Sequence, residues 1–217
     1  MPTIPYKNKD GKRIPGATTI PGQNVGWGKD ALIYWANAGG LEGKDLNELR
    51  DSATVSGTVA HLMIECDLLV TTPNLTPYKQ EDIDKAEVAY LAYLDWRKQF
   101  SFEPLAVEPH LVSEKYQYGL TPDVIGYVKD KLSLIDWKTG RIYENTFLQL
   151  AAYKQGWEEN NPDKPIEGGF HVLRIPKNEE TPSFHHSYWA VLPPEAWECF
   201  ECALKLHENK KALKKLL

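Results

Sequence analysis

Apolar positions recur at helical spacing through the first half of the chain, and we expect three helices there, over residues 30–38, 45–70 and 81–99. The first should end at Gly39-Gly40. The second takes Asp45 as its N-cap and has a point of interruption at Ser56-Gly57. The apolar stripe of the first helix comprises Leu32, Ile33, Trp35 and Ala36, and the buried face of the third comprises Ala86, Ala89, Tyr90, Tyr93, Leu94 and Trp96.

The second half of the chain favours strands. Two β-rich runs, 124–128 and 132–135, flank the polar Lys129-Asp130-Lys131, which predicts a hairpin. Three more strands are expected, over residues 104–112, 167–175 and 184–192. A helix is expected over 146–153, and a last helix from Pro193 to the lysine-rich end. Near the start, residues 6–20 predict a short hairpin with Asp10-Gly11 at its turn.

This order of elements predicts an α/β protein with a mixed central β-sheet flanked by helices. At 217 residues the chain is long enough for one domain with a sizeable core. We expect residues 1–100 to form the N-terminal hairpin and helices, 101–192 the sheet core and 193–217 a C-terminal helix. No run of 18 apolar residues occurs and the first residues lack a signal peptide, so we expect a cytoplasmic protein without membrane contact.

Polar side chains gather around the predicted central hairpin. Asp123 opens its first strand and Asp136 closes the second. Because side chains alternate along a strand, Asp136 and Lys138 should point to one face and Trp137 to the other. Two aspartates from adjacent strands form a hard oxygen site of the kind that Mg²⁺ or Mn²⁺ prefers. A lysine beside them can orient a water molecule and stabilise charge on a phosphate. Alternatively, Asp136 and Lys138 form an exposed ion pair with little energetic weight.

Two further sets of residues sit at helical spacing near this centre. Gln149 and Tyr153 lie at i and i+4 on the predicted helix, so they share a face. His61 and Glu65 have the same spacing on an earlier helix, an arrangement suited to metal ligation or to a hydrogen-bonded pair. A lone histidine on a helix is more often structural or exposed to solvent.

Pro122-Asp123, Asp136-Trp137-Lys138 and the Gln149 and Tyr153 pair together resemble the signature of the PD-(D/E)XK nuclease superfamily, closest to its RecB-type and phage exonuclease branch. The upstream Gly57-Thr58-Val59-Ala60-His61 segment resembles the histidine-bearing helix of that branch. The resemblance covers about residues 13–192 and implies a restriction-endonuclease-like core. It also implies a Mg²⁺- or Mn²⁺-dependent deoxyribonuclease, an exonuclease on linear DNA in phage-type recombination or DNA processing, acting in the host cytoplasm.

The resemblance assigns a role to each site residue. Metal ligands would be Asp123 and Asp136, with His61, Glu108 and the backbone carbonyl of Trp137 completing one or two metal sites. Lys138 would position the attacking water, and Gln149 and Tyr153 would contact the phosphate backbone or support Lys138. Glu108 is favoured as the acidic ligand because it follows an apolar run, as a strand residue should, and Glu114 is its rival. Three roles stay open for Glu65, which are to bind metal, to orient His61 or to face solvent.

DNA is the partner that the resemblance implies, together with a single-strand annealing or recombination protein. The formal net charge of −5 is not the basic balance typical of nucleic-acid binders. Basic residues do gather at both ends of the chain, as a DNA footprint or as solvated surface. They are Lys7, Lys9, Lys12 and Arg13 at the start, and Lys205, Lys210, Lys211, Lys214 and Lys215 at the end. The oligomeric state stays open.

Three cysteines suit a reducing compartment. Some relatives hold an iron–sulfur cluster with one upstream and three C-terminal cysteines, whereas this chain has Cys66 upstream and only Cys199 and Cys202 near its end. We therefore expect no cluster, and expect Cys199 and Cys202 to be core residues. Surface or edge-strand positions are expected for Arg174, His171, His185 and His186. Two rival functions are a structure-specific endonuclease on the same fold and a non-catalytic module that binds DNA ends.

Overall fold

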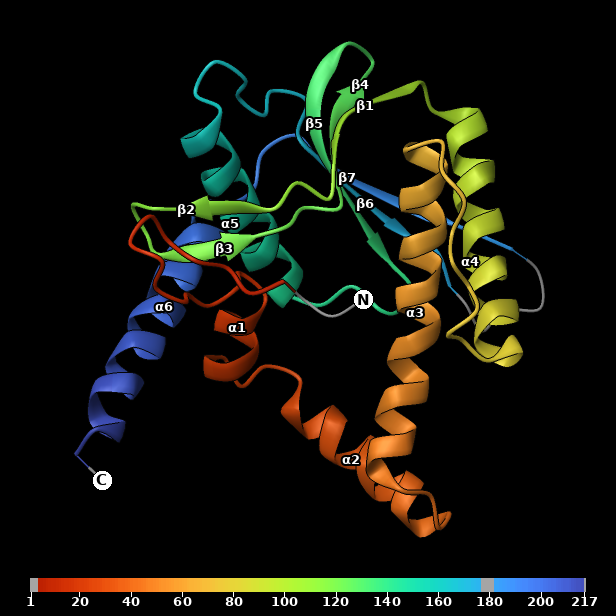
Figure 1. Cartoon of the computed structure of the whole chain (residues 1–217), viewed down its shortest axis with the longest axis horizontal. Helices are drawn as coiled ribbons and strands as arrows, with labels where there is room; N and C mark the ends of the chain where they lie inside the picture. Colours follow the sequence, from red (N-terminus) through yellow and green to blue (C-terminus); the bar gives the residue numbers. More distant parts are fainter. Residues whose placement is uncertain (1–3, 177–181, 217) are drawn as a thin grey trace.

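The computed structural model describes residues 4–176 and 182–216, and its centre is a five-stranded mixed β-sheet with strand order β1-β4-β5-β6-β7 (Figure 1). Only the pairing of β5 with β6 is parallel. A separate two-stranded antiparallel sheet pairs β2 with β3. The strands are β1 Phe102–Val107, β2 Leu111–Ser113, β3 Tyr118–Leu120, β4 Val124–Val128, β5 Lys131–Lys138, β6 Phe170–Arg174 and β7 His185–Trp189. The predicted mixed sheet flanked by helices is confirmed.

Helices cover both faces of the large sheet (Figure 1). On one face α3 and α4 bury Ile135 and Trp137 of β5, and on the other α1, α5 and α6 bury Leu134. The two faces follow the strict alternation of side chains along β5. The helices are α1 Thr19–Asn24, α2 Lys29–Leu41, α3 Leu46–Leu68, α4 Gln80–Gln99, α5 Asn145–Asn160 and α6 Pro194–Lys214.

The hairpin of β4 and β5 forms where the sequence predicts it. Its turn is made by Lys129 and Asp130, which both have positive φ angles, 50° and 65°, as the tightest hairpin turns require. Val124 pairs with Ile135, so the preceding Asp123 is brought to the level of Asp136 on the neighbouring strand. The turn and the register therefore place the two aspartates side by side.

Several predicted boundaries are wrong. The expected strand over 104–112 stops at Val107, because Glu108 adopts a left-handed conformation with φ of 43° and the chain then joins the smaller sheet as β2. The expected interruption at Ser56-Gly57 is absent, since α3 runs through it, and α2 continues through Gly39-Gly40 to Leu41. A single glycine costs a helix only about 1 kcal/mol, which packing readily offsets.

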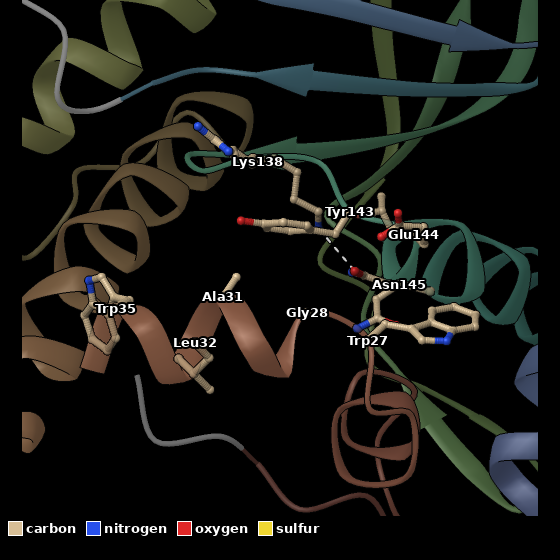
Figure 2. A pocket seen from close by; sticks show the side chains of 12 residues that line it. Trp27, Gly28, Ala31, Leu32, Trp35, Lys138, Tyr143, Glu144 and Asn145 are labelled. Carbon is tan, nitrogen blue, oxygen red and sulfur yellow. Dashed lines mark hydrogen bonds between the residues drawn. The ribbon is translucent and has the colours of Figure 1, made fainter. Parts of the chain in front are cut away.

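The α2 helix departs most from expectation. An apolar stripe on a helix ordinarily faces the core, yet Leu32 and Ile33 are 60% and 64% exposed. Gly39 is the only residue of α2 that is buried among those the structure describes. The helix runs beneath the body of the domain between α1 and the start of α3 (Figure 1), and one side of it borders an open cleft (Figure 2).

Expectations for cysteine and histidine side chains also need correction. Cys202 is exposed and Cys199 is only partly buried, so the core placement is wrong for Cys202. His171 is buried, because β6 is an interior strand of the sheet, and its Nδ1 atom lies 2.9 Å from Nε2 of His186 on β7. The surface position expected for His171 is therefore wrong.

The N-terminal hairpin is confirmed, with Lys7 bridged to Arg13 and Gly11 at the turn with φ of 74°. It leads into α1, which the sequence pattern did not predict. Arg13 and Lys211 of α6 line the same surface pocket, so the two basic ends of the chain meet there. None of the helices in the described part of the chain combines the length and apolarity needed to cross a bilayer.

Candidate active site

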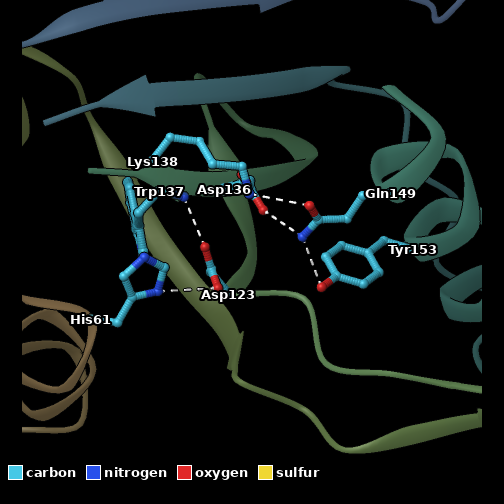
Figure 3. Close-up of polar contacts among 7 residues, drawn as sticks. All are labelled: His61, Asp123, Asp136, Trp137, Lys138, Gln149 and Tyr153. Carbon is cyan, nitrogen blue, oxygen red and sulfur yellow. Dashed lines mark hydrogen bonds and ion pairs between the residues drawn. The ribbon is translucent and has the colours of Figure 1, made fainter. Parts of the chain in front are cut away.

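Residues from α3, the hairpin of β4 and β5, and α5 converge at one end of the interior strands β4 and β5 of the large sheet (Figure 3). Glu108, directly after β1, joins them. The hairpin supplies the two aspartates and Lys138, α3 supplies His61 from one face of the sheet, and α5 supplies Gln149 and Tyr153 from the other. The site thus lies where the two helical layers approach the same strand ends.

One part of the site is a set of potential metal ligands, His61, Glu108 and Asp123, called here the ligand cluster. Their ligand atoms all lie within 4.8 Å of one another. The imidazole Nδ1 of His61 lies 3.5 Å from Oδ1 of Asp123, and the backbone N–H of Trp137 donates to Oδ2 of Asp123 at 2.8 Å. The second contact fixes the Asp123 carboxylate against the end of β5.

The second part is a hydrogen-bonded network of Asp136, Lys138, Gln149 and Tyr153, called here the lysine network (Figure 3). The Nζ atom of Lys138 lies 2.6 Å from Oδ2 of Asp136 and donates to Oε1 of Gln149 at 3.2 Å. The Gln149 amide nitrogen donates to Oδ1 of Asp136 at 3.2 Å and to the Tyr153 hydroxyl at 2.9 Å. One glutamine side chain therefore holds the lysine, the aspartate and the tyrosine together.

Burial makes Asp136 and Glu108 hold their protons more tightly than ordinary carboxyls. It raises the pKa of Asp136 to about 6, where the nearby Asp123 adds to the effect and Lys138 opposes it. Burial likewise raises the pKa of Glu108 to about 7, with further contributions from the charges of Glu65 and Asp123. Crowded carboxyl groups of this kind are stabilised in their charged form by a nearby cation.

Asp123 and Lys138 keep their charges at neutral pH. Burial opposes the charge of Asp123, but His61 beside it outweighs this and lowers the pKa of Asp123. Burial also opposes a charge on His61, yet Asp123 raises its pKa overall. In the same way the attraction of Asp136 and Asp123 outweighs burial and raises the pKa of Lys138. Lys138 therefore stays a cation at neutral pH.

The donor types in the ligand cluster suit Mg²⁺ or Mn²⁺. Two carboxylates supply the hard oxygen ligands that both ions prefer, and the imidazole adds one nitrogen ligand. Burial raises the pKa of Glu108 and the charges of Glu65 and Asp123 add to the effect, so a divalent cation would stabilise its charged form. The cluster therefore fits the ion that the sequence motif implies.

The structure separates the two rival glutamates. Glu108 belongs to the ligand cluster, whereas Glu114 accepts a hydrogen bond from the backbone N–H of Lys9 at 2.8 Å. Glu65 lies near enough to Glu108 to raise its pKa, but it is not part of the ligand cluster. A role for the Trp137 carbonyl as a ligand stays a prediction.

The exposed ion pair considered for Asp136 and Lys138 is wrong, because the Asp136 side chain is 0% exposed and that of Lys138 is 22% exposed. Trp137 points to the opposite face, as predicted, where its ring packs edge-on against Tyr93 and Trp96 of α4. The strand alternation alone was enough to foresee this division of side chains.

One neighbour of the site could not be found from the sequence. Tyr6 of the N-terminal hairpin stacks on His110, with ring centroids 4.3 Å apart, and shares a hydrogen bond of 2.7 Å with the Thr121 hydroxyl. A side chain at Gly119 would collide with the Tyr6 ring, since its Cβ would lie 1.8 Å from it. Burial raises the pKa of Tyr6, and the charge of Glu108 in the ligand cluster adds to this effect. Gly119 is the one sequence feature related to this contact, because only glycine leaves room for the Tyr6 ring, but the sequence does not show which residue fills that space.

Comparison of the chain with protein-family models gives no match, and comparison with curated proteins gives no significant match. A function for this chain must therefore be argued from the chemistry of the ligand cluster and the lysine network.

Proposed function

We propose that this protein is a metal-dependent deoxyribonuclease of the PD-(D/E)XK superfamily that hydrolyses phosphodiester bonds, acting as an exonuclease on linear DNA. One observation carries the proposal: the ligand atoms of His61, Glu108 and Asp123 lie within 4.8 Å of one another, directly beside the buried pair of Asp136 and Lys138. Carboxylates, a histidine and a lysine in one place suit phosphoryl transfer assisted by a divalent cation.

The fold supports this proposal. A hairpin within a mixed sheet presents the two aspartates and Lys138, while helices on both faces supply His61 and Gln149. This arrangement is consistent with the restriction-endonuclease-like core that the sequence resemblance implies.

The ligand cluster would hold Mg²⁺ or Mn²⁺, which when bound supplies Lewis-acid activation of the phosphate and of a water molecule. His61 would contribute a nitrogen ligand, and Asp123 would contribute a carboxylate held in place by the Trp137 N–H at 2.8 Å. Glu108 would lose its proton more readily beside the ion, because the cation stabilises the charged form that burial and the neighbouring carboxylates disfavour.

Lys138 would orient the water and stabilise the negative charge that develops on the phosphate. Its position is fixed from two sides, by Asp136 at 2.6 Å and by Gln149 at 3.2 Å. A lysine side chain is otherwise flexible, so these contacts reduce the cost of ordering it in the transition state. Gln149 and Tyr153 act through this positioning rather than by touching the reacting atoms.

The affinity for DNA would come from backbone contacts. A site that reads phosphates carries no sequence information, because phosphates are alike at every step. Arg13 and Lys211, which line one pocket beside the N-terminal hairpin, supply positive charge for such contacts. This local charge offsets the net charge of −5 carried by the whole chain.

Incubation of the purified protein with Mg²⁺ and either linear or covalently closed circular DNA tests the proposal. We expect loss of nucleotides from linear DNA and no change in the closed circle. Cleavage of both forms would indicate an endonuclease on the same site. Stable binding of linear ends without cleavage in Mg²⁺ or Mn²⁺ would contradict the proposed hydrolysis.

A further inference from the structure

The lysine network borders a second feature, a cleft of about 520 Å³ between α2 and the segment that joins β5 to α5 (Figure 2). Lys138 and Gln149 line one wall of this cleft, so it opens directly onto the proposed catalytic lysine. Its volume lies within the range of about 300 to 1,000 Å³ that is typical of ligand-binding clefts. A single extended ligand could therefore occupy both the cleft and the candidate active site.

Aromatic rings with accessible faces line this cleft. Trp27, just before α2, is 46% exposed, Trp35 within α2 is 39% exposed and Tyr143, from the opposite wall, is 53% exposed. The hydrophobic core does not account for these three rings, because each of them is exposed and none belongs to the buried residues of the domain. Large aromatic faces held open to solvent next to a polar site are suited to stacking against a planar ligand.

The cleft also carries positive charge. Arg141 lines it together with Lys138, and Glu144 is the one acidic residue among the described residues of its lining. Aromatic rings interleaved with cations match the chemistry of single-stranded nucleic acid, in which bases stack on rings and phosphates meet basic side chains. The excess of cations over acidic residues in the lining favours a polyanion such as a nucleic acid over a peptide or a second copy of the chain.

We propose that this aromatic cleft takes unpaired nucleotides of the DNA strand that is being cut, next to the scissile phosphate. The inference rests on the proposed nuclease function and adds its substrate class, a single-stranded DNA end. The faces of paired bases are covered by their neighbours in a duplex, whereas unpaired bases present both faces to Trp27 and Tyr143. Arg141 would contact the adjoining backbone phosphate.

A binding experiment without turnover tests this inference. The probe is a fluorescently labelled oligothymidylate of about 12 nucleotides, compared with a duplex of the same length, both measured by anisotropy in Ca²⁺. We expect Trp27→Ala and Tyr143→Ala each to raise the Kd for the single strand at least about fivefold, because each removes a stacking surface. Trp27→Phe should keep most of the affinity, since it keeps an aromatic face.

Two further variants guard against a general loss of folding. Tyr34 lies on α2 and is 76% exposed, but it does not line the cleft. Tyr34→Ala should therefore bind the single strand like the wild type. Arg141 is exposed, so Arg141→Gln should fold normally, weaken binding and reduce the dependence of Kd on salt concentration.

The inference is overturned if Trp27→Ala and Tyr143→Ala bind the single strand as the wild type does, or if Tyr34→Ala loses as much affinity as they do. It is also overturned if both cleft variants change the oligomeric state in solution without changing DNA binding, because the cleft would then be an interface between copies of the chain. Nucleolytic activity on linear DNA alongside unaltered binding by the cleft variants would remove this inference and leave the proposed function standing. If the wild type binds the single strand through the cleft but cleaves no DNA, the cleft remains a single-strand binding site and the proposed nuclease function fails.

Discussion

The Nζ atom of Lys138 lies 2.6 Å from Oδ2 of Asp136, and the Asp136 side chain is completely buried. A buried pair of this kind adds little stability as a pair, but removal of one partner leaves the other charge uncompensated. In the proposed function the pair has a catalytic role, because it holds a cation beside the ligand cluster. The structural role of the pair can be measured as the free energy of unfolding, and its catalytic role as the rate of DNA cleavage.

We predict that Lys138→Met lowers the rate of DNA cleavage at least about 100-fold, because it removes the charge that stabilises the transition state. It should also lower the free energy of unfolding by about 2 to 3 kcal/mol, since Asp136 loses its partner. Adding Asp136→Asn to Lys138→Met should restore much of this stability without restoring cleavage. Urea unfolding and single-turnover assays measure the two effects, and recovery of cleavage in the double variant would exclude a catalytic role for Lys138.

The two glutamates that the sequence left as rivals should behave differently toward metal. We predict that Glu108→Gln raises the Mn²⁺ concentration needed for half-saturation about 10- to 100-fold, because it removes a carboxylate from the ligand cluster. Glu114→Gln is the matched control, since Glu114 bonds to the backbone of Lys9 instead. Calorimetric titration of the apoprotein with Mn²⁺ measures both. Equal effects of the two substitutions would remove Glu108 from the metal site.

A divalent cation should also govern the affinity for DNA. Asp123 keeps its negative charge, because His61 lowers its pKa, and at 4 Å such a charge repels a phosphate by about 4 kcal/mol at an effective dielectric constant of 20. We predict that DNA binds more tightly in Ca²⁺ than in chelator at the same ionic strength. Asp123→Asn should bind better than the wild type in chelator and lose most of the gain from Ca²⁺. If the wild type binds equally well in both conditions, metal does not bridge protein and DNA.

Protein stability should depend on pH through His171. Burial, together with the neighbouring His186 and Lys129, lowers the pKa of His171 from 6.5 to about 4. Between these values the unfolded chain binds a proton that the folded protein excludes, so the contribution of His171 to stability should fall as the pH drops from 6.5 to 4. We expect this contribution to fall by about 2 kcal/mol, allowing for the part of the ring that solvent reaches. The raised pKa values of Asp136 and Glu108 act in the opposite direction, because the folded protein binds their protons more tightly.

His171→Leu removes this titration, so its free energy of unfolding relative to that of the wild type should rise by about 2 kcal/mol as the pH drops from 6.5 to 4. His185→Leu is the control, because His185 lies on the exposed part of β7. A difference between His171→Leu and the wild type that stays constant across this pH range would show that His171 does not titrate as expected.

The rules for turns, strands and helices predict the centre of the site from the sequence. The polar turn at Lys129 and Asp130 predicts the hairpin, strand alternation predicts that Asp136 and Lys138 share a face, and helical spacing predicts that Gln149 and Tyr153 do. Each of these relationships joins residues that are close in sequence or lie on paired strands. The structure contains all three features, and the last two bring Asp136, Lys138, Gln149 and Tyr153 together in the lysine network.

Long-range contacts could not be foreseen in the same way. The left-handed conformation of Glu108 ends β1 early, and no propensity marks a glutamate for it. Tyr6 bonds to Thr121, which lies 115 residues later in the chain, so its place depends on the completed fold. The exposed stripe of α2 looks like a core face in sequence, because composition alone cannot tell a core surface from a binding surface.

The most direct test of the nuclease proposal is a cleavage assay on end-labelled linear DNA with three proteins, the wild type, Asp123→Asn and Glu114→Gln, each in Mg²⁺ and in chelator. We predict cleavage by the wild type and by Glu114→Gln in Mg²⁺, none in chelator, and a loss of at least about 100-fold in Asp123→Asn. Asp123→Asn keeps the shape of the side chain and removes only its charge, so correct folding can be verified by the same melting transition. Wild-type cleavage by Asp123→Asn, cleavage in chelator, or no cleavage by the wild type in either Mg²⁺ or Mn²⁺ would contradict the proposed function.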